Sequence, residues 1–132
     1  MPYLLDSDWL IAYLSLDSDT VRRVTDLSAD GIAMSIVSYI ELYEGYVRKV
    51  GRPLATATLE ALASQIEVLH LSVGVAQRCG VLRATLREQG KRVNSRSLDL
   101  IIAATALEYG MTLATRNLHD FQDIADLQLL TA

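Results

Sequence analysis

The chain has 132 residues, of which 51% are hydrophobic and 21% are charged, with a formal net charge of −4 at pH 7. A chain of this length forms a core without cross-links. Cys79 is the only cysteine, which excludes a disulfide scaffold and favours a reducing compartment. No apolar run approaches the ~20 residues of a membrane span, and the first ten residues hold acids but no base, unlike a signal peptide. We predict one cytoplasmic domain, residues 1–132, with no membrane partner.

Charge is distributed unevenly along the chain. Residues 1–77 hold ten acids and five bases, and residues 97–132 hold five acids and one base. Between them, residues 78–96 hold six bases against Glu88 alone. A basic segment between two acidic ones suggests a phosphate-facing patch beside a carboxylate cluster. The alternative is a helix face that simply meets solvent.

Short apolar runs alternate with longer helical patterns along the whole chain. We expect strands at residues 3–5, 32–34, 67–71 and 111–115, with a weaker fifth at 127–130. We expect helices at residues 9–14, 19–28, 36–49, 54–65, 73–89 and 98–109. Strands joined through helices require crossover connections, which make neighbouring strands parallel. The predicted fold class is therefore α/β, a three-layer α/β/α domain around a mostly parallel sheet of four to five strands.

Three carboxylates interrupt apolar surroundings, namely Asp6, Glu41 and Asp99. A buried acid needs a partner, because an isolated buried charge is very costly. Each also has a local explanation. Asp6 can cap the helix that follows it, Glu41 can close a capping box with Ser38, and Asp99 can favour the dipole of its helix. Asp120 can be an ordinary loop acid. Only the set of four indicates a site.

Four stretches of the sequence follow one another in a recognisable order, namely residues 4–8 (LLDSD), 35–45 (SIVSYIELYEG), 98–107 (LDLIIAATAL) and 113–121 (LATRNLHDF). In this order they resemble the PIN-domain family, and within it the VapC-type toxins of bacterial and archaeal type II toxin–antitoxin modules. The resemblance covers essentially the whole chain. It implies a PIN-like domain and a ribonuclease that depends on a divalent metal ion.

The resemblance also implies a set of site residues. The family's three acidic positions match Asp6, Glu41 and Asp99. The fourth acidic position falls on either Asn117 or Asp120. We assign it to Asp120, because an amide carries no negative charge, and we keep Asn117 as a supporting polar group. Two small hydroxyl residues, which help to order the site in similar proteins, are Ser7 and Thr115.

These residue types suit metal-dependent hydrolysis. Mg²⁺ and Mn²⁺ prefer oxygen ligands. Carboxylates brought together without a metal repel one another, so at least one should have a raised pKa. We expect Asp6 and Asp99 to hold Mg²⁺ (or Mn²⁺), with Glu41 and Asp120 completing the ring. Glu41 is the candidate for orienting or deprotonating water. No histidine is needed in this scheme, although His119 adjoins Asp120.

The implied partners are RNA, an antitoxin and a second copy of the chain. Basic side chains that precede Asp99 or follow the fourth strand are expected to hold the RNA backbone, and they are Arg83, Arg87, Lys91, Arg92, Arg96 and Arg116. Aromatic residues on the first helices form either ordinary core or a groove for the helix of a VapB-type antitoxin. Homodimers are usual in similar proteins.

Other functions compete with this interpretation. The main alternative is a catalytically silent PIN-like module that binds RNA or protein. An acid-cluster phosphatase or a 5′-nuclease would need more length, and a receiver domain would need an Asp at the end of its third strand, where this chain has His70 and Leu71. Metal dependence of RNA cleavage discriminates between these functions.

Overall fold

The computed structural model describes residues 2–131 of the chain. Its strands form a single five-stranded sheet in the order β3-β2-β1-β4-β5, with every neighbouring pair parallel. The strands are β1 (Tyr3–Leu5), β2 (Ile32–Ser35), β3 (Glu67–Leu69), β4 (Thr112–Ala114) and β5 (Leu129–Leu130). All five predicted strands are present, although the last three are shorter than expected.

Six α-helices connect these strands in the described part of the chain. They are α1 (Ser7–Leu14), α2 (Ser18–Ser28), α3 (Ile36–Val50), α4 (Arg52–Gln65), α5 (Val73–Glu88) and α6 (Ser97–Glu108). Two short 3₁₀ turns, η1 (Asn94–Arg96) and η2 (Leu118–Asp120), were not predicted. Side-chain caps define several helix starts. For example, the Ser35 hydroxyl accepts a hydrogen bond from the Ser38 amide at the start of α3.

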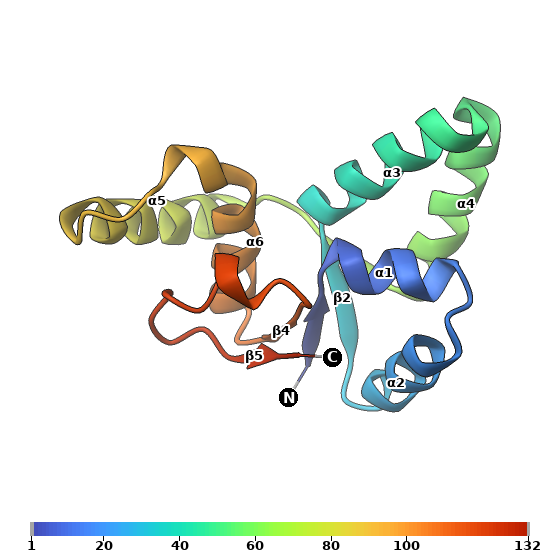
Figure 1. The fold of residues 1–132 in the computed structure, drawn as a ribbon, viewed down its shortest axis with the longest axis horizontal. Helices are drawn as coiled ribbons and strands as arrows, with labels where there is room; N and C mark the ends of the chain where they lie inside the picture. The colour runs from blue at the N-terminus through green and yellow to red at the C-terminus, as the bar shows by residue number, and fades with distance from the viewer. Residues whose placement is uncertain (1, 132) are drawn as a thin grey trace.

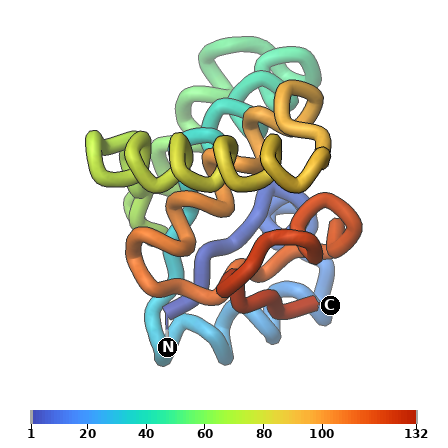
Figure 2. Tube along the Cα trace, turned by 90° about the vertical axis from the view of Figure 1, so that its left-hand side faces the viewer, coloured from blue at the N-terminus to red at the C-terminus, as the bar shows by residue number. Residues whose placement is uncertain are grey.

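The helices cover both faces of the sheet. In Figure 1, α5 and α6 lie on one side of the strands and α1 to α4 on the other, and Figure 2 shows α5 running across the outside of its layer. Neighbouring residues of a strand point to opposite faces, so Leu4 joins the core under α5 and α6 while Leu5 joins the core under α1 to α4. The predicted α/β class and three layers are therefore confirmed, and the sheet is wholly parallel.

The topology places a crevice beyond the ends of two strands. From β1 the chain moves outward through β2 to β3, and it then returns on the other face to β4 and β5. The winding direction thus changes between β1 and β4, which are neighbours in the sheet. In open parallel sheets, ligands bind outside the carboxyl ends of the strands at such a point. The residues that follow β1 and β4 are therefore the first place to look for a site.

No helix within residues 2–131 is both long enough and apolar enough to cross a membrane.

Candidate active site

Asp6 stands at the end of β1 and is only 7% exposed. Its Oδ1 accepts a hydrogen bond of 2.8 Å from the Ser7 amide, and its Oδ2 accepts one of 2.8 Å from the Thr115 hydroxyl at the end of β4. Asp6 therefore caps α1 with one oxygen and bonds with the other to the end of β4. Burial raises its pKa from 3.8 to about 6, with smaller upward contributions from the charges of Asp8 and Glu41 and opposition from the Thr115 and Ser7 hydrogen bonds.

Glu41 lies on α3, in the second turn after β2. The capping box proposed for it is wrong, because α3 begins after Ser35 and Ser38 is already inside the helix. Partial burial raises the pKa of Glu41. The hydrogen bond from the Ser7 side chain lowers it, and the charges of Asp99 and Asp8 raise it further. The negative charge of Glu41 is thus felt by carboxylates from two other elements.

Asp99 lies in the first turn of α6, and Asp120 closes the 3₁₀ turn that follows β4. Burial raises the pKa of Asp99, the charge of Asp120 raises it further, and the charge of Arg96 lowers it. The amide group of Asn117 donates a hydrogen bond to the carboxylate of Asp120. Both candidates for the fourth position therefore meet at one point, with Asp120 carrying the charge and Asn117 holding it.

Asp8, the acid two residues after Asp6, was not among the predicted site residues. Its Oδ2 accepts a hydrogen bond of 3.0 Å from the Arg116 amide, and its charge acts on both Asp6 and Glu41. The signal was present as the repeated acid in the Asp6-Ser7-Asp8 stretch. That repeat is also typical of a helix start, so it does not by itself indicate a site residue.

The donor set fits a hard divalent cation. The carboxylates of Asp6, Glu41, Asp99 and Asp120 come from separate elements, offer only oxygen atoms, and influence one another in sequence around the crevice. Among residues 2–131, no three acids, cysteines or histidines already converge as a closed set of ligands. Mg²⁺ does not require one, because it keeps several waters and takes one or two carboxylates. The four carboxylates are therefore suited to a hydrated ion.

Comparison with known proteins agrees with this fold. The model of the PIN domain matches residues 3–127 of the chain. The chain belongs to the PIN-domain family. It is 31% identical over 131 residues to Ribonuclease VapC1 of Haemophilus influenzae (strain R2866), covering 97% of this chain and 96% of that protein.

Two further similarities extend over the full length of this PIN domain. The chain is 27% identical over 128 residues to the tRNA(fMet)-specific endonuclease VapC of Shigella flexneri, covering 97% of this chain and 96% of that protein. It also matches the structure of VapBC2 from Rickettsia felis bound to a DNA fragment from the promoter, with a TM-score of 0.85, 25% identity, and coverage of 100% and 99% of the two chains. The chain is thus a PIN-domain protein homologous to the VapC ribonuclease toxins of VapBC toxin–antitoxin systems.

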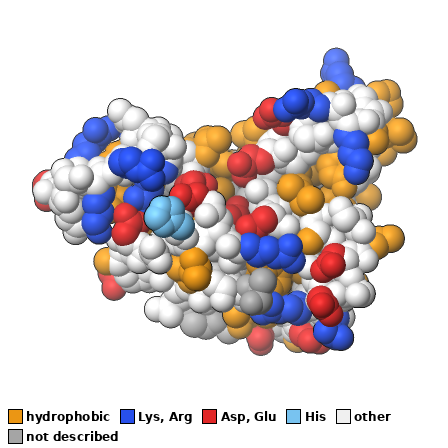
Figure 3. Space-filling view, in the orientation of Figure 1, with side chains coloured by type: hydrophobic (Ala, Val, Ile, Leu, Met, Phe, Trp, Pro, Cys, Tyr) orange, Lys and Arg blue, Asp and Glu red, His pale blue; other side chains and the backbone are white. Residues whose placement is uncertain are grey.

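Several basic residues of the PIN domain lie on the α5 side of the carboxylates. Arg83 and Arg87 both donate hydrogen bonds to the Asn94 side chain, at 3.0 and 2.9 Å. Lys91 and Arg92 line a hollow of about 390 Å³ that also includes Asp120. Figure 3 shows basic atoms beside acidic ones on this part of the surface, with acidic atoms continuing toward the middle of the face. Lys91 and Arg92 thus place positive charge beside Asp120, whereas Arg83 and Arg87 are hydrogen-bonded to Asn94.

Arg96 and Arg116, like Arg83 and Arg87, bond to other parts of the protein. Arg96 is 9% exposed, and its guanidinium forms an ion pair of 2.7 Å with Asp123, so its charge is already paired within the protein. Arg116 is exposed, but its Nη2 donates a hydrogen bond of 2.7 Å to the Thr20 hydroxyl. Both side chains already hold parts of the protein together.

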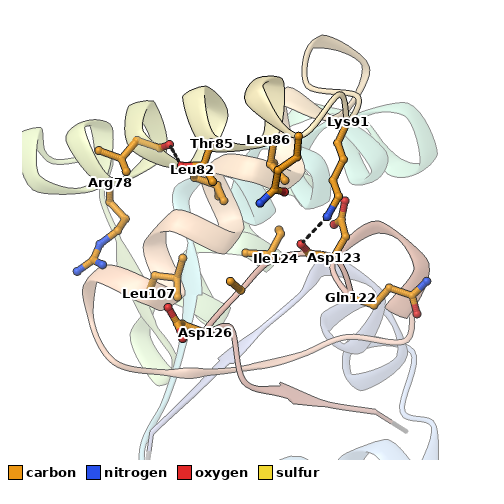
Figure 4. Close-up of a pocket in the computed structure, with 13 residues that line it drawn as sticks. Arg78, Leu82, Thr85, Leu86, Lys91, Leu107, Gln122, Asp123, Ile124 and Asp126 are labelled. Atoms are coloured by element: carbon orange, nitrogen blue, oxygen red, sulfur yellow. Dashed lines mark hydrogen bonds between the residues drawn. The ribbon is translucent and has the colours of Figure 1, made fainter.

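Another hollow, of about 460 Å³, lies between α5, α6 and the loop before β5 (Figure 4). None of the four candidate carboxylates lines it. The close-up shows Lys91 extending to the Asp123 carbonyl, a contact of 3.4 Å. This hollow is therefore separate from the candidate active site, although Lys91 and Asp123 lie at the border between the two.

Proposed function

We propose that this PIN-domain protein is a divalent-metal-dependent endoribonuclease that acts as the toxin of a type II toxin–antitoxin module. The observation that carries the proposal is the convergence of Asp6, Glu41 and Asp99, from three separate elements, on the crevice beyond β1 and β4. Each of these acids has a raised pKa, caused first by burial. Carboxylates kept together in this way gain stability when a cation neutralises them.

The four carboxylates have different roles in this proposal. Asp6 and Asp99 hold Mg²⁺ or Mn²⁺, with Glu41 and Asp120 completing the ring. When bound, the cation lowers the pKa of water and offsets the charge of the phosphate during an in-line displacement. Glu41 accepts the proton of the attacking water, because its raised pKa makes it a better base than an ordinary carboxylate. Ser7 and Thr115 keep Glu41 and Asp6 in place through their hydrogen bonds.

The substrate is RNA, held by its backbone. Arg83, Arg87, Lys91 and Arg92 supply positive charge on the Asp120 side of the crevice. Sequence preference then comes from unpaired bases and RNA shape rather than from groove reading. The name of the Shigella flexneri relative specifies a transfer RNA, which makes transfer RNA the first substrate to test.

The proposed protein partners are a VapB-type antitoxin and a second copy of the chain. A hollow of about 180 Å³ between α1 and α3 contains Glu41 and Lys49 together with the apolar side chain of Ile11. Ile11 is 52% exposed and Ile40, beside Glu41, is 55% exposed. An amphipathic antitoxin helix placed there would cover these side chains and block Glu41.

The test is RNA cleavage by the purified chain, freed from any co-purified protein. Total RNA and a transfer RNA pool are incubated with Mg²⁺ or Mn²⁺, with EDTA, and with the Asp99→Asn variant. Asp26→Asn is the matched control, because Asp26 is an exposed acid on α2, outside the crevice. We expect cleavage that needs the metal and is lost in Asp99→Asn alone.

The same samples separate a nuclease from a silent binding module. A bound metal stabilises the folded state by RT ln(1 + [L]/Kd), so Mn²⁺ should raise the Tm of the wild type and of Asp26→Asn but not that of Asp99→Asn. No cleavage of either RNA together with no metal-dependent shift would contradict the proposed enzyme and favour the silent module.

A further inference from the structure

Arg96 makes an unusual set of contacts for a residue beside an acidic site. Its Nη1 and Nη2 each donate a hydrogen bond of 2.7 Å to the two carboxylate oxygens of Asp123, and Nη2 donates another of 2.7 Å to the carbonyl of Asp120. The side chain of Arg96 is 8% exposed and that of Asp123 is 27% exposed. The guanidinium thus connects the start of α6 to the turn that carries the fourth acid.

These contacts are a poor means of stabilising the fold. Burying an ion pair removes water from both charges and adds little net stability. The Arg96 Nε is also buried and has no hydrogen-bond partner within residues 2–131, and this carries a further penalty. An apolar side chain would fill the position at lower cost, so the arrangement is better explained by what it holds in place.

Arg96 lies three residues before Asp99 and bonds directly to the backbone of Asp120. The planar guanidinium of Arg96, a rigid fork of donors, therefore fixes the relative position of two acids that belong to different elements, α6 and η2. Asp123 fixes the fork, and Asp123 is itself held from a third element, because the Lys91 ammonium donates to its carbonyl. Only a planar guanidinium can bond both the Asp123 carboxylate and the Asp120 carbonyl in this geometry.

We propose that Arg96 is a positioning residue that, through Asp123 and the Asp120 carbonyl, sets the distance between Asp99 and Asp120 for metal binding. The inference rests on the proposed function. It removes Arg96 from the residues that touch RNA and gives it a role through other side chains. A variant that loses the fork should bind the cation more weakly and turn over more slowly, while its affinity for RNA stays the same.

The experiment compares Arg96→Lys with the wild type and with Arg78→Lys. Arg78 pairs with Glu108 at 3.4 Å between α5 and α6, away from the carboxylates, so the same substitution there is a matched control. Mn²⁺ binding is measured by electron paramagnetic resonance of the free ion, without RNA. Removing such a supporting contact typically weakens metal affinity by about 10-fold or more, and we expect this for Arg96→Lys only. The kcat for RNA cleavage should fall with it, at unchanged KM and saturating Mn²⁺.

A second variant keeps the test decisive if Arg96→Lys does not fold. Asp123→Asn retains Arg96 and its bond to the Asp120 carbonyl but removes the charge that fixes the fork, and it should show a smaller loss in the same direction. Wild-type Mn²⁺ affinity in these variants, or a raised KM with unchanged kcat, would overturn the inference alone. A wild type that neither binds Mn²⁺ nor cleaves RNA would overturn the proposed function and this inference with it.

Discussion

The two halves of the candidate site are held by different means. Asp6 is attached directly to the sheet, since it ends β1 and bonds to Thr115 at the end of the neighbouring β4. Asp99 and Asp120 lie outside the sheet, on a helix and a 3₁₀ turn, and the Arg96–Asp123 pair joins them. The first half owes its geometry to backbone pairing, whereas the second depends on one ion pair.

The two halves also differ in what their charges contribute to stability. The pKa of Asp6 is raised to about 6, so its ionised form is disfavoured by folding. The pKa of Asp123 is lowered, first by its hydrogen bond with Arg96, so its ionised form is favoured by folding. The contribution of Asp6 to the free energy of unfolding is fully present below pH 3.8 and is lost as the pH rises through about 6. Stability from Asp123 is present above its ordinary pKa and is lost as the pH falls through its lowered one.

Asp6→Asn should have the largest effect, with opposite signs for stability and activity. Asn keeps the capping oxygen but removes the buried charge, so the metal-free protein should gain up to about 3 kcal/mol in unfolding free energy at pH 7. The gain should shrink toward pH 4, where Asp6 is protonated in the folded wild type. Urea unfolding in EDTA at both pH values measures this. Cleavage should fall by about 100-fold or more. A variant no more stable than the wild type at pH 7 would show that burial does not disfavour the charge of Asp6.

Asp123→Asn should act in the other direction. Breaking its charge pair with Arg96 should cost about 2 kcal/mol at pH 7, less than a fully buried pair would. Because the pKa of Asp123 is lowered, the difference from the wild type should disappear as the pH falls through that lowered pKa, where the folded carboxyl takes up a proton. Thermal unfolding across this pH range measures the effect, with Asp26→Asn as the control. A difference that persists at acid pH would assign the effect to packing instead of charge.

Thr115→Val tests how much the Thr115 hydroxyl stabilises the buried charge of Asp6. The substitution keeps the shape but removes the hydroxyl that donates to Asp6 and accepts from the Asn117 amide. We expect a loss of about 1 to 2 kcal/mol at pH 7. The loss should be smaller in an Asp6→Asn background, because the hydroxyl then no longer faces a buried charge. A double-mutant cycle in urea measures the coupling, and equal losses in the two backgrounds would contradict it.

Arg92→Ala should have the smallest effect on the fold and a specific effect on RNA. Arg92 is exposed and lines the hollow beside Asp120, so stability should stay within about 0.5 kcal/mol of the wild type. KM for RNA should rise several-fold, and the slope of log affinity against log salt should fall by about one. Arg52→Ala, an exposed base at the start of α4, is the control. Equal changes of KM and salt slope in both variants would mean that Arg92 acts only through the net charge of the protein and does not contact RNA.

Most of the fold and part of the site follow from local features of the sequence. Apolar runs that end at Asp6 and before Arg116 predicted strands, and their separation by helices predicted a parallel sheet. Those features are local because side-chain periodicity and helix caps depend on residues a few positions apart. The site residues Asp6, Glu41 and Asp99 were predicted as acids in apolar surroundings and by resemblance to the PIN family. The capping box at Glu41 was wrong because Ser35, and not Ser38, begins the helix.

The sequence by itself therefore determined the strand and helix pattern, the parallel sheet, and which acids belong to the candidate site. Only the tertiary structure decided that Arg96 pairs with Asp123, that the charge of Asp8 acts on Asp6, and that the Arg116 side chain bonds to Thr20. The reason is physical. These contacts join residues up to 96 positions apart, and a charged side chain in a sequence looks the same whether it meets solvent, a phosphate or a buried partner until the chain has folded.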